Sequence, residues 1–369
     1  MFIVFRVDAT AAIGMGHLMR SLVLAEALTK SGHTCRFICK LEPTNLIDLI
    51  RARGFSVDML GLQADSNSGV RPNQNFETAA SEEEDARQVL TLLRGLPCDW
   101  LVVDHYRLSR QWELLVRVAC RHLMVIDDLA NRHHEADLLL DQNYYKNYQI
   151  RYDQLIPETC ERLLGLKYLL LSDNYYLNIR KPRPYSNIVS NILVFFGGSD
   201  PTKETEKFLA AIEAFPMSDI TYELVVGAAN LRAREIDQRC KILPSVVFHF
   251  QTSKMDRLCA RADLALGAGG SANWERFCFG VPTLVIATAQ NQVETVLSLS
   301  KVGAIKFLGW HEDVRPIDFS TAISKAVEKP LERFKMAQCA KQLVTEAASY
   351  GVKFVVERMQ AINRGKNGF

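Results

Sequence analysis

The sequence predicts an α/β fold with two doubly wound, Rossmann-like domains that face each other across a cleft. The chain has 369 residues, which exceeds one ordinary core and suits two domains of about 100–200 residues each. Short aliphatic and β-branched segments alternate with helix-length amphipathic segments, a pattern typical of parallel sheets covered by helices. The alternation restarts after a polar stretch with two prolines at residues 173–187. Such sheets bind ligands beyond the carboxyl ends of their strands, so we expect the site in the cleft.

The first half of the chain supplies one set of alternating elements. We expect strands at residues 2–8, 34–39, 56–60, 100–103, 123–126 and 138–140. We expect helices at residues 17–31, 82–94 and 108–121. Ser81 and Glu84 have the spacing of a capping box, which predicts that the second of these helices opens there. The polar residues 61–80 between strand and helix form a long loop.

The second half repeats this organisation. Strands are expected at residues 191–196, 222–226, 246–250, 264–267, 283–287 and 304–308, and closing helices at 331–347 and 352–363. The stretch 173–187 loses helical periodicity and is taken as the linker. The resulting expectation is an N-terminal domain over residues 1–178 and a C-terminal domain over residues 179–369. The last helices can pack back on the first domain.

The composition excludes several classes of protein. Hydrophobic residues make up 48% of the chain, charged residues 23%, and the formal net charge is +2. A nucleic-acid surface needs a concentrated basic excess, so no nucleic-acid partner is expected. No apolar run approaches the roughly 18 residues of a membrane span, and the first residues lack the features of a signal peptide. We therefore expect a cytoplasmic protein with no membrane partner that acts as a monomer.

The cysteines and histidines give no metal pattern. The chain has nine cysteines in apolar stretches and no CxxC pair, which favours reduced, buried thiols. His133, His134 and Glu135 are adjacent, but no HExxH motif and no Asp-x-Asp pair occurs. We expect no metal and no cofactor.

A glycine loop follows the first strand and leads into the first helix. Gly14 and Gly16 allow backbone amides and the positive end of the helix dipole to face an anion or a polar substrate. The loop is not the dinucleotide fingerprint, because Met19 occupies the third glycine position. His17 stands at the helix start and Arg20 one turn later, on the same face. A helix N-terminus disfavours the imidazolium, so the ring should stay neutral and able to accept a proton.

A second glycine loop follows the strand at 264–267. Gly267, Gly269 and Gly270 lead to Ser271 and a helix, which predicts a pyrophosphate cradle made of backbone amides. Glu275 lies one turn into that helix, where a carboxylate can accept hydrogen bonds from both ribose hydroxyls. Another glycine pair at a strand end offers Gly197, Gly198 and Ser199 to the same cleft. Three such strand ends indicate a nucleoside diphosphate ligand.

Several carboxylates of the first half also follow strands. Asp104 with Tyr106, the pair Asp127 and Asp128, and Asp141 with Asn143 lie at three strand ends. These side chains either position a sugar and the histidine or cap helices, and the residues alone favour neither alternative.

Five motifs together carry a resemblance to a known family. RVDATAAIGMGHLMR, VVDHY, DDLANR with LLLDQN, FFGGSDP, and GAGGSANWERFCFGVP with NQ occur in this order between residue 3 and about residue 292. The chain resembles the UDP-sugar hydrolases of pseudaminic acid biosynthesis. The pattern differs at Thr10, where serine is usual, and at Ala272, where a hydroxyl residue is common. The family in turn resembles the peptidoglycan N-acetylglucosaminyltransferase, which implies the glycosyltransferase-B architecture.

The resemblance implies an activity and assigns residues to it. It implies hydrolysis of UDP-2,4-diacetamido-2,4,6-trideoxy-β-L-altropyranose, with His17 as the catalytic base. Gly14 and Gly16 form its loop, and Gly269, Gly270, Ser271 and Glu275 hold the UDP. Further substrate contacts are expected from residues of the same motifs: Asp8, Thr10, Arg20, Tyr106, Asn143, Gly198, Ser199, Asn273, Asn291 and Gln292.

The mechanism that we expect is a single displacement at the anomeric carbon with inversion. His17 removes a proton from water, a role typically contributing about 10²–10⁴ in rate. UDP is a stable leaving group, so amides and the helix dipole can carry its charge without a general acid. The alternatives are a glycosyltransferase of the same architecture, in which an acceptor hydroxyl replaces water, a nucleotide-sugar epimerase, and a non-catalytic nucleotide-sugar binder.

Overall fold

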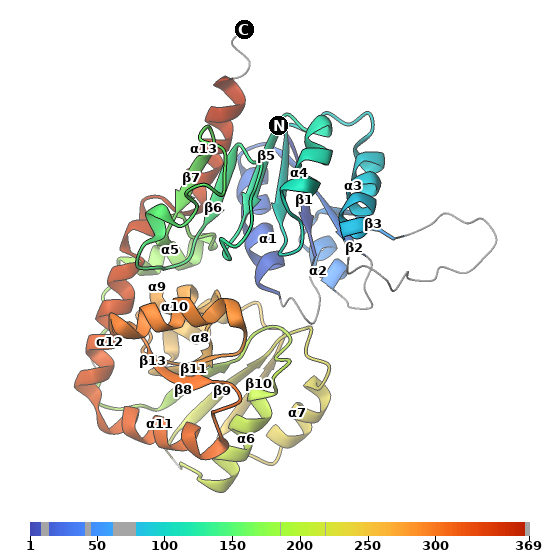
Figure 1. Cartoon of the computed structure of the whole chain (residues 1–369). Coiled ribbons are helices and arrows are strands. Elements are labelled where there is room, and N and C mark those ends of the chain that lie inside the picture. The colour runs from blue at the N-terminus through green and yellow to red at the C-terminus, as the bar shows by residue number, and fades with distance from the viewer. Residues whose placement is uncertain (9–14, 41–45, 62–78, 185, 218, 366–369) are drawn as a thin grey trace, which may run out of the picture.

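The computed structural model describes residues 1–8, 15–40, 46–61, 79–184, 186–217 and 219–365. Within these residues the chain forms two lobes stacked on each other, each built around one parallel sheet (Figure 1). The sheets have the strand orders β3-β2-β1-β4-β5-β6-β7 and β10-β9-β8-β11-β12-β13. Both orders reverse direction beside the first strand of the lobe, as in doubly wound sheets. The predicted fold class is confirmed.

The sheet of the N-terminal lobe has seven strands. They are β1 (Phe2–Val7), β2 (Thr34–Lys40), β3 (Ser56–Leu60), β4 (Trp100–Asp104), β5 (His122–Ile126), β6 (Leu138–Asp141) and β7 (Glu161–Leu164). All pairings are parallel. Every residue of β4, β5 and β6 is buried. Parallel strands covered by helices on both faces need such continuous apolar runs.

The helices of this lobe connect consecutive strands. They are α1 (Gly16–Lys30), α2 (Leu46–Ala52), α3 (Ala79–Leu93), α4 (Arg110–Val116) and α5 (Asp173–Ile179), with 3₁₀ turns at Arg117–Ala119, Tyr148–Ile150 and Leu166–Tyr168. Helix α1 buries Leu18, Leu22 and Ala25 against the sheet, because these residues recur at helical spacing.

The sheet of the C-terminal lobe has six parallel strands. They are β8 (Asn191–Phe195), β9 (Thr221–Val226), β10 (Val246–Phe250), β11 (Leu264–Ala268), β12 (Thr283–Ala287) and β13 (Lys306–Trp310). The helices of this lobe are α6 (Glu204–Ala214), α7 (Ala233–Cys240), α8 (Met255–Arg261), α9 (Ala272–Cys278), α10 (Gln290–Lys301), α11 (Pro316–Glu328) and α12 (Pro330–Leu343). A 3₁₀ turn at Thr345–Ala348 then leads to the last helix, α13 (Gly351–Gly365). Helices α8, α9 and α10 lie on the side of this lobe that faces the N-terminal lobe (Figure 1).

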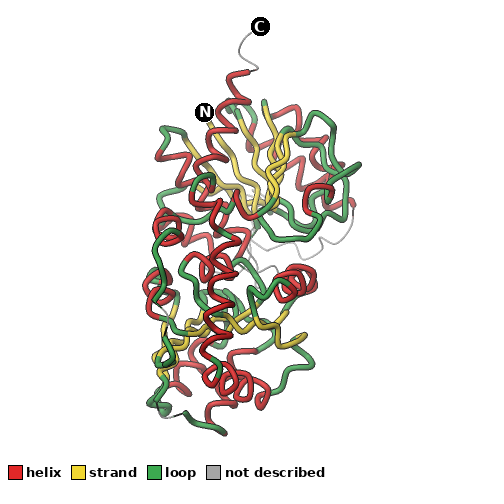
Figure 2. Tube along the Cα trace, turned by 90° about the vertical axis from the view of Figure 1, so that its left-hand side faces the viewer, coloured by secondary structure: helices red, strands yellow, loops and turns green. Residues whose placement is uncertain are grey.

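The last helix of the chain belongs to the core of the first lobe. Val355 and Met359 of α13 are fully buried in the cluster that contains Phe5 and Leu22. Helical segments run along the side of both lobes (Figure 2). Within the described residues no helix is long and apolar enough to cross a bilayer.

Two local predictions were wrong, and one strand was not predicted. The stretch 173–187 is not all linker, because residues Asp173–Ile179 form α5, whose Tyr175 and Ile179 are buried. Helix α3 begins at Ala79, so Ser81 lies inside the helix rather than at its start. Strand β7 was not predicted. Its four residues ERLL are short and half polar, which gives little periodicity to detect.

Candidate active site

His17 is the second residue of α1 and lies at its N-terminus, facing the ends of β4 and β5. The imidazole is buried, with 4% of the residue exposed. Its Nδ1 contacts Asp104 Oδ1 at the end of β4. Because a carboxylate only accepts, this contact places the hydrogen of a neutral imidazole on Nδ1 and leaves the Nε2 lone pair open. Nε2 is buried and has no hydrogen-bond partner in the described part of the chain.

Asp104 is held by several donors. Arg20, one turn after His17, donates from Nε to Asp104 Oδ2 at 2.7 Å and from Nη2 to Oδ1 at 2.6 Å. The Ser21 hydroxyl approaches Oδ2 at 3.3 Å. Burial alone would raise the pKa of Asp104, but the Arg20 guanidinium and the hydrogen bond from His17 hold it well below its usual range. Asp104 is therefore a permanent carboxylate that orients the imidazole.

Arg20 links this pair to the next strand end. Its Nη1 donates to Asp128 Oδ2 at 3.0 Å, beyond β5. Strands β4 and β5 are neighbours, so the two aspartates share one edge of the sheet. The Oδ1 atom of Asp128 is buried and has no hydrogen-bond partner within the described residues. Arg20 thus touches both carboxylates and fixes their separation from the histidine.

Tyr106 closes the site toward the other lobe. Its ring lies edge-on to the His17 ring, with centroids 4.2 Å apart. Its hydroxyl is 3.4 Å from Asp128 Oδ2 and accepts from Asn291 Nδ2 of α10 at 2.7 Å. Burial raises the pKa of Tyr106 well above its usual range, so the phenol keeps its proton. Tyr106 and Asn291 therefore meet beside the histidine. They come from different halves of the chain, and both were predicted to contact the substrate.

The glycine loops of the two lobes also approach each other. A Cβ on Gly16 would lie 3.6 Å from Ser271 Oγ at the start of α9. A Cβ on Gly198 would lie 2.5 Å from the Met15 side chain, closer than real Cβ contacts. The absence of a side chain at Gly198 lets the lobes meet here. Ser199 follows it and is buried.

The loop after β11 packs against α10. Gln292 Oε1 accepts hydrogen bonds from the amide of Gly269 at 3.2 Å and from the amide of Thr288 at 3.0 Å. A Cβ on Gly269 would lie 2.4 Å from Val296 Cγ1, whereas the nearest atom to one on Gly270 is 3.8 Å away. Gln292 therefore shapes the loop, and Gly269 is required for its close contact with α10.

Glu275 of α9 accepts a hydrogen bond from a residue of the segment 173–187, which was predicted to be the linker. Tyr175 in α5 donates its hydroxyl hydrogen to Glu275 Oε2 at 3.0 Å. Burial raises the pKa of Glu275 to about 7, against the opposing effect of this hydrogen bond. A buried carboxylate that accepts one hydrogen bond from a phenol retains capacity to accept hydrogen bonds from ligand hydroxyl groups.

Arg276, next in α9, is a buried cation that sequence reasoning did not single out. It donates to Asn273 Oδ1 at 2.6 Å and to Ala268 O at 3.2 Å, directly under the glycine loop. Its Nε and Nη1 have no hydrogen-bond partner among the described residues. Burial lowers the pKa of Arg276 to about 10. Its positive charge is therefore available to a ligand anion held by the loop above it.

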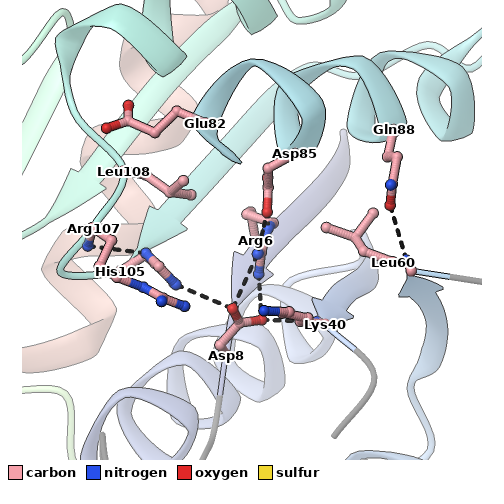
Figure 3. Close-up of a pocket in the computed structure, with 11 residues that line it drawn as sticks. Arg6, Asp8, Lys40, Leu60, Glu82, Asp85, Gln88, His105, Arg107 and Leu108 are labelled. Atoms are coloured by element: carbon pink, nitrogen blue, oxygen red, sulfur yellow. Dashed lines mark hydrogen bonds and ion pairs between the residues drawn. The ribbon is translucent and has the colours of Figure 1, made fainter. Parts of the chain in front are cut away.

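Asp8 is fully engaged by the protein itself. Its Oδ1 accepts from Arg6 at 2.5 Å and from the Lys40 amide at 2.8 Å, and its Oδ2 accepts from Arg6 at 3.0 Å and His105 Nε2 at 3.1 Å. Figure 3 shows these groups converging on the carboxylate in a charged pocket whose lining also includes Asp85. With four donors on two oxygens, Asp8 retains little capacity to accept from a substrate.

Asn143 belongs to a neighbouring carboxylate cluster. Its amide and Nδ2 donate to Asp141 Oδ1 at 3.0 and 3.3 Å. The Tyr152 hydroxyl lies 3.0 Å from Asp127 Oδ2 and 3.1 Å from Asp141 Oδ2. The single hydroxyl hydrogen of Tyr152 therefore lies between two carboxyl groups. Burial and the charge of Asp128 raise the pKa of Asp141 to about 7.

The structure thus brings His17, Arg20, Tyr106 and Asn291 into one site and adds Asp104 and Asp128 to them. Gly16 and Ser271 lie across from each other between the lobes. Asp8 and Asn143 form their hydrogen bonds in other networks. Thr10 and Gly14 lie outside the described residues. Within the described ranges no three His, Cys, Asp or Glu side chains gather as a metal-binding group.

Comparison with known proteins gives relatives at low identity. No protein-family model matches the chain. It is 36% identical over 123 residues to the spore coat polysaccharide biosynthesis protein SpsG of Bacillus subtilis, a match that spans 33% of this chain and 36% of that protein. It is 22% identical over 304 residues to the UDP-2,4-diacetamido-2,4,6-trideoxy-β-L-altropyranose hydrolase of Campylobacter jejuni, covering 82% of this chain and 97% of the hydrolase.

Solved structures resemble the whole chain. The crystal structure of Acinetobacter baumannii MurG matches with a TM-score of 0.63 at 14% identity, over 98% of this chain and 100% of that one. Similarity at this identity concerns the fold. The chain has the glycosyltransferase-B fold.

Proposed function

We propose that this protein is an enzyme that acts on a nucleotide sugar, and that it hydrolyses a UDP-activated 2,4-diacetamido-2,4,6-trideoxy hexose of altrose configuration. The observation that carries the proposal is the buried His17, whose Nδ1 is held by Asp104 while Nε2 has no partner in the described residues. This arrangement leaves a base pointing into the interlobe site. The Campylobacter relative, named for this hydrolysis, aligns over most of the chain and supports the choice of substrate.

In this proposal the two halves of the chain divide the work. Residues 1–178 hold the sugar and the base, and residues 179–369 hold UDP. The loop at Gly269–Ser271 receives the diphosphate, Arg276 lies beneath that loop, and Glu275 accepts the ribose hydroxyls. The proposal includes a cytoplasmic, monomeric protein. The reaction needs no metal or other cofactor, because amides, a helix N-terminus and a buried arginine can carry the charge of the leaving group.

The reaction is a single displacement. Water attacks the anomeric carbon, the bond from that carbon to the phosphate oxygen breaks, and UDP leaves with the bonding electrons. His17 Nε2 takes one proton from the water. The sugar is released with inverted configuration as its free 1-hydroxyl form, for use in pseudaminic acid biosynthesis.

The proposal is tested by incubating the purified protein with UDP-2,4-diacetamido-2,4,6-trideoxy-β-L-altropyranose in ¹⁸O-water. We expect UDP release without any acceptor, with label in the free sugar and none in UDP. His17→Ala should lower kcat by about 10²–10⁴ while retaining UDP binding. Label in the phosphate, or UDP release that depends on an added acceptor, contradicts the hydrolase and favours another reaction on the same fold.

A further inference from the structure

Two buried acceptor atoms of the site have no hydrogen-bond partner among the residues that the structure describes. One is Nε2 of His17 and the other is Oδ1 of Asp128, and neither has a hydrogen-bond partner in the described part of the chain. Buried polar atoms are normally paired, because desolvation without a hydrogen bond is unfavourable. Two such acceptors in one site therefore indicate a ligand that donates two hydrogen bonds.

Shared neighbours place the two acceptors together. Arg20 donates to Asp128 Oδ2 at 3.0 Å and also binds Asp104, which contacts His17. The rings of Tyr106 and His17 form a T-shaped contact, and the Tyr106 hydroxyl points toward Asp128 Oδ2. Because Asp128 Oδ2 already contacts Arg20 and Tyr106, Oδ1 is the oxygen that remains for a ligand.

The oxygens of two other aspartates that follow these strands have donors or cations of the protein beside them. Both oxygens of Asp104 accept from Arg20, and Oδ1 also contacts His17. Asp127 Oδ1 likewise has no hydrogen-bond partner among the described residues, but the Arg132 Nη1 cation lies 2.8 Å from it, and Asp127 Oδ2 accepts from the Ala130 amide at 2.8 Å. Of these three aspartates, Asp128 is the one whose unpaired oxygen has no cation against it within the described residues.

We propose that Asp128 orients the nucleophilic water, with Oδ1 accepting one water hydrogen while His17 Nε2 accepts the other. This inference rests on the proposed function and assigns Asp128 to the same site. As the oxygen attacks the anomeric carbon, the proton on the His17 side transfers to Nε2 and the bond to UDP breaks. The second hydrogen stays on the oxygen and becomes the 1-hydroxyl hydrogen of the product, still donated to Asp128.

Such a pair of acceptors distinguishes water from an alcohol. Water has two O–H bonds and can satisfy both acceptors, whereas an alcohol has one and would leave the Asp128 carboxylate unpaired in a buried site. Asp128 is therefore also a specificity-determining residue, because it favours hydrolysis over transfer of the sugar to a hydroxyl acceptor.

The experiment measures how the enzyme partitions between water and methanol, with UDP-2,4-diacetamido-2,4,6-trideoxy-β-L-altropyranose as the substrate. In Asp128→Asn the amide oxygen faces the Arg20 donors, so the amide NH₂ is directed where the water must donate. We expect kcat for hydrolysis to fall about tenfold or more with KM within about threefold. The ratio of methyl glycoside to free sugar should rise, and this ratio does not depend on the fraction of folded protein.

A matched control loses the same kind of contact elsewhere. Asp85 pairs with Arg6 Nη2 at 2.6 Å in the N-terminal lobe, away from His17, so Asp85→Asn should leave the methanol-to-water ratio unchanged. An unchanged ratio in Asp128→Asn overturns the assignment of Asp128 even if kcat falls. Failure of the wild-type protein to hydrolyse the substrate instead overturns the proposed function, so the two failures are distinguishable.

Discussion

The orientation of His17 depends on one carboxylate 87 positions away in the sequence. Asp104 fixes the tautomer that leaves Nε2 unprotonated, and Arg20 fixes Asp104. The sequence predicts His17 and Arg20, because both stand on one face of a helix behind a glycine loop. It leaves the role of Asp104 open, since nothing local distinguishes an orienting carboxylate from a helix cap.

Replacing Asp104 by asparagine tests this dependence. Asparagine can donate to Nδ1, which stabilises the tautomer with the hydrogen on Nε2 and removes the base. We expect Asp104→Asn to lower kcat for UDP release by about 10²–10⁴, with KM changed far less, as measured by steady-state kinetics. Asp58→Asn breaks a comparable contact with Arg36, of 2.5 Å, and should have little effect on kcat. Equal losses of kcat in the two variants would mean that Asp104 contributes only to the stability of the protein.

We expect Glu275 to make nucleotide binding depend on pH. The carboxyl pKa is raised to about 7 in the free protein, so the group is largely neutral at pH 6 and ionised at pH 8. Only the ionised form accepts from both ribose hydroxyls. We expect the affinity for UDP to rise between these pH values, and Glu275→Gln to weaken binding at pH 8 by roughly 10-fold or more, as measured by calorimetry.

The UDP phosphates also titrate near pH 6, at about the value of other phosphate esters, so the ligand needs its own control. 2′-Deoxy-UDP has the same phosphates and one ribose hydroxyl fewer, and its affinity should rise less with pH.

The same pKa shift predicts how the stability of the free protein changes with pH. A pKa raised above 4.5 contributes stability at low pH that is lost as the pH rises through about 7. Glu275→Gln should therefore raise the Tm of free protein at pH 8, whereas an unchanged Tm and an unchanged pH slope would contradict the assignment.

At the level of elements, the sequence pattern identified strands well where they are buried on both faces, as in β4 and β12. It missed β7 and misassigned α5, because four residues are too few for periodicity and the polar sequence DNYYLNI resembles a loop. The error affected the site, since Tyr175 of α5 contacts Glu275. Packing against α9 stabilises this helix, and that tertiary contact is invisible in the local sequence.

The contact between the loop after β11 and α10 gives a paired prediction. Gly269→Ala would place Cβ 2.4 Å from the buried Val296 Cγ1, so the loop or α10 must move. Overpacking of this kind typically destabilises by about 1–3 kcal/mol, and we expect both the Tm and the affinity for UDP to fall. Gly270→Ala has its nearest neighbour at 3.8 Å and should leave the Tm nearly unchanged.

A second substitution identifies the cause. Val296→Ala removes the closest of the atoms that the new Cβ would meet, so the double variant Gly269→Ala, Val296→Ala should bind UDP more tightly than Gly269→Ala alone. Thermal unfolding and calorimetric titration of the four proteins measure both effects. Absence of this rescue, with Gly270→Ala equally impaired, would show that backbone freedom rather than space decides the residue at position 269.

On the scale of the whole molecule, contacts between the lobes come from both glycine loops and from α10. Met15 meets Gly198, Gly16 faces Ser271, and Tyr106 binds Asn291. The arrangement of two sheets follows from the alternation of apolar segments in the sequence. The meeting of particular residues does not, because it depends on how two separately patterned lobes are positioned relative to each other.

The chain also crosses between the lobes a second time, and this crossing makes a testable prediction about stability. Helix α13 is the last helix in the sequence, yet Met359 is fully buried in the cluster around Phe5 and Leu22 of the N-terminal lobe. Met359→Ala should therefore lower the free energy of unfolding by about 2–5 kcal/mol, the usual effect of emptying a buried methionine site. Glu357 on the same helix is exposed, and Glu357→Ala should change it by less than about 0.5 kcal/mol.

Hydrogen exchange locates the effect. If α13 stabilises the first lobe, Met359→Ala should accelerate amide exchange in β1 and β2 more than in β8 and β9, although the substitution lies more than a hundred residues after β9 in the sequence. Faster exchange mainly in β8 and β9 would assign α13 to the second lobe instead. Equal acceleration in both sheets would show that the lobes open as one cooperative unit, and the boundary expected near residue 178 would then separate structures but not folding units.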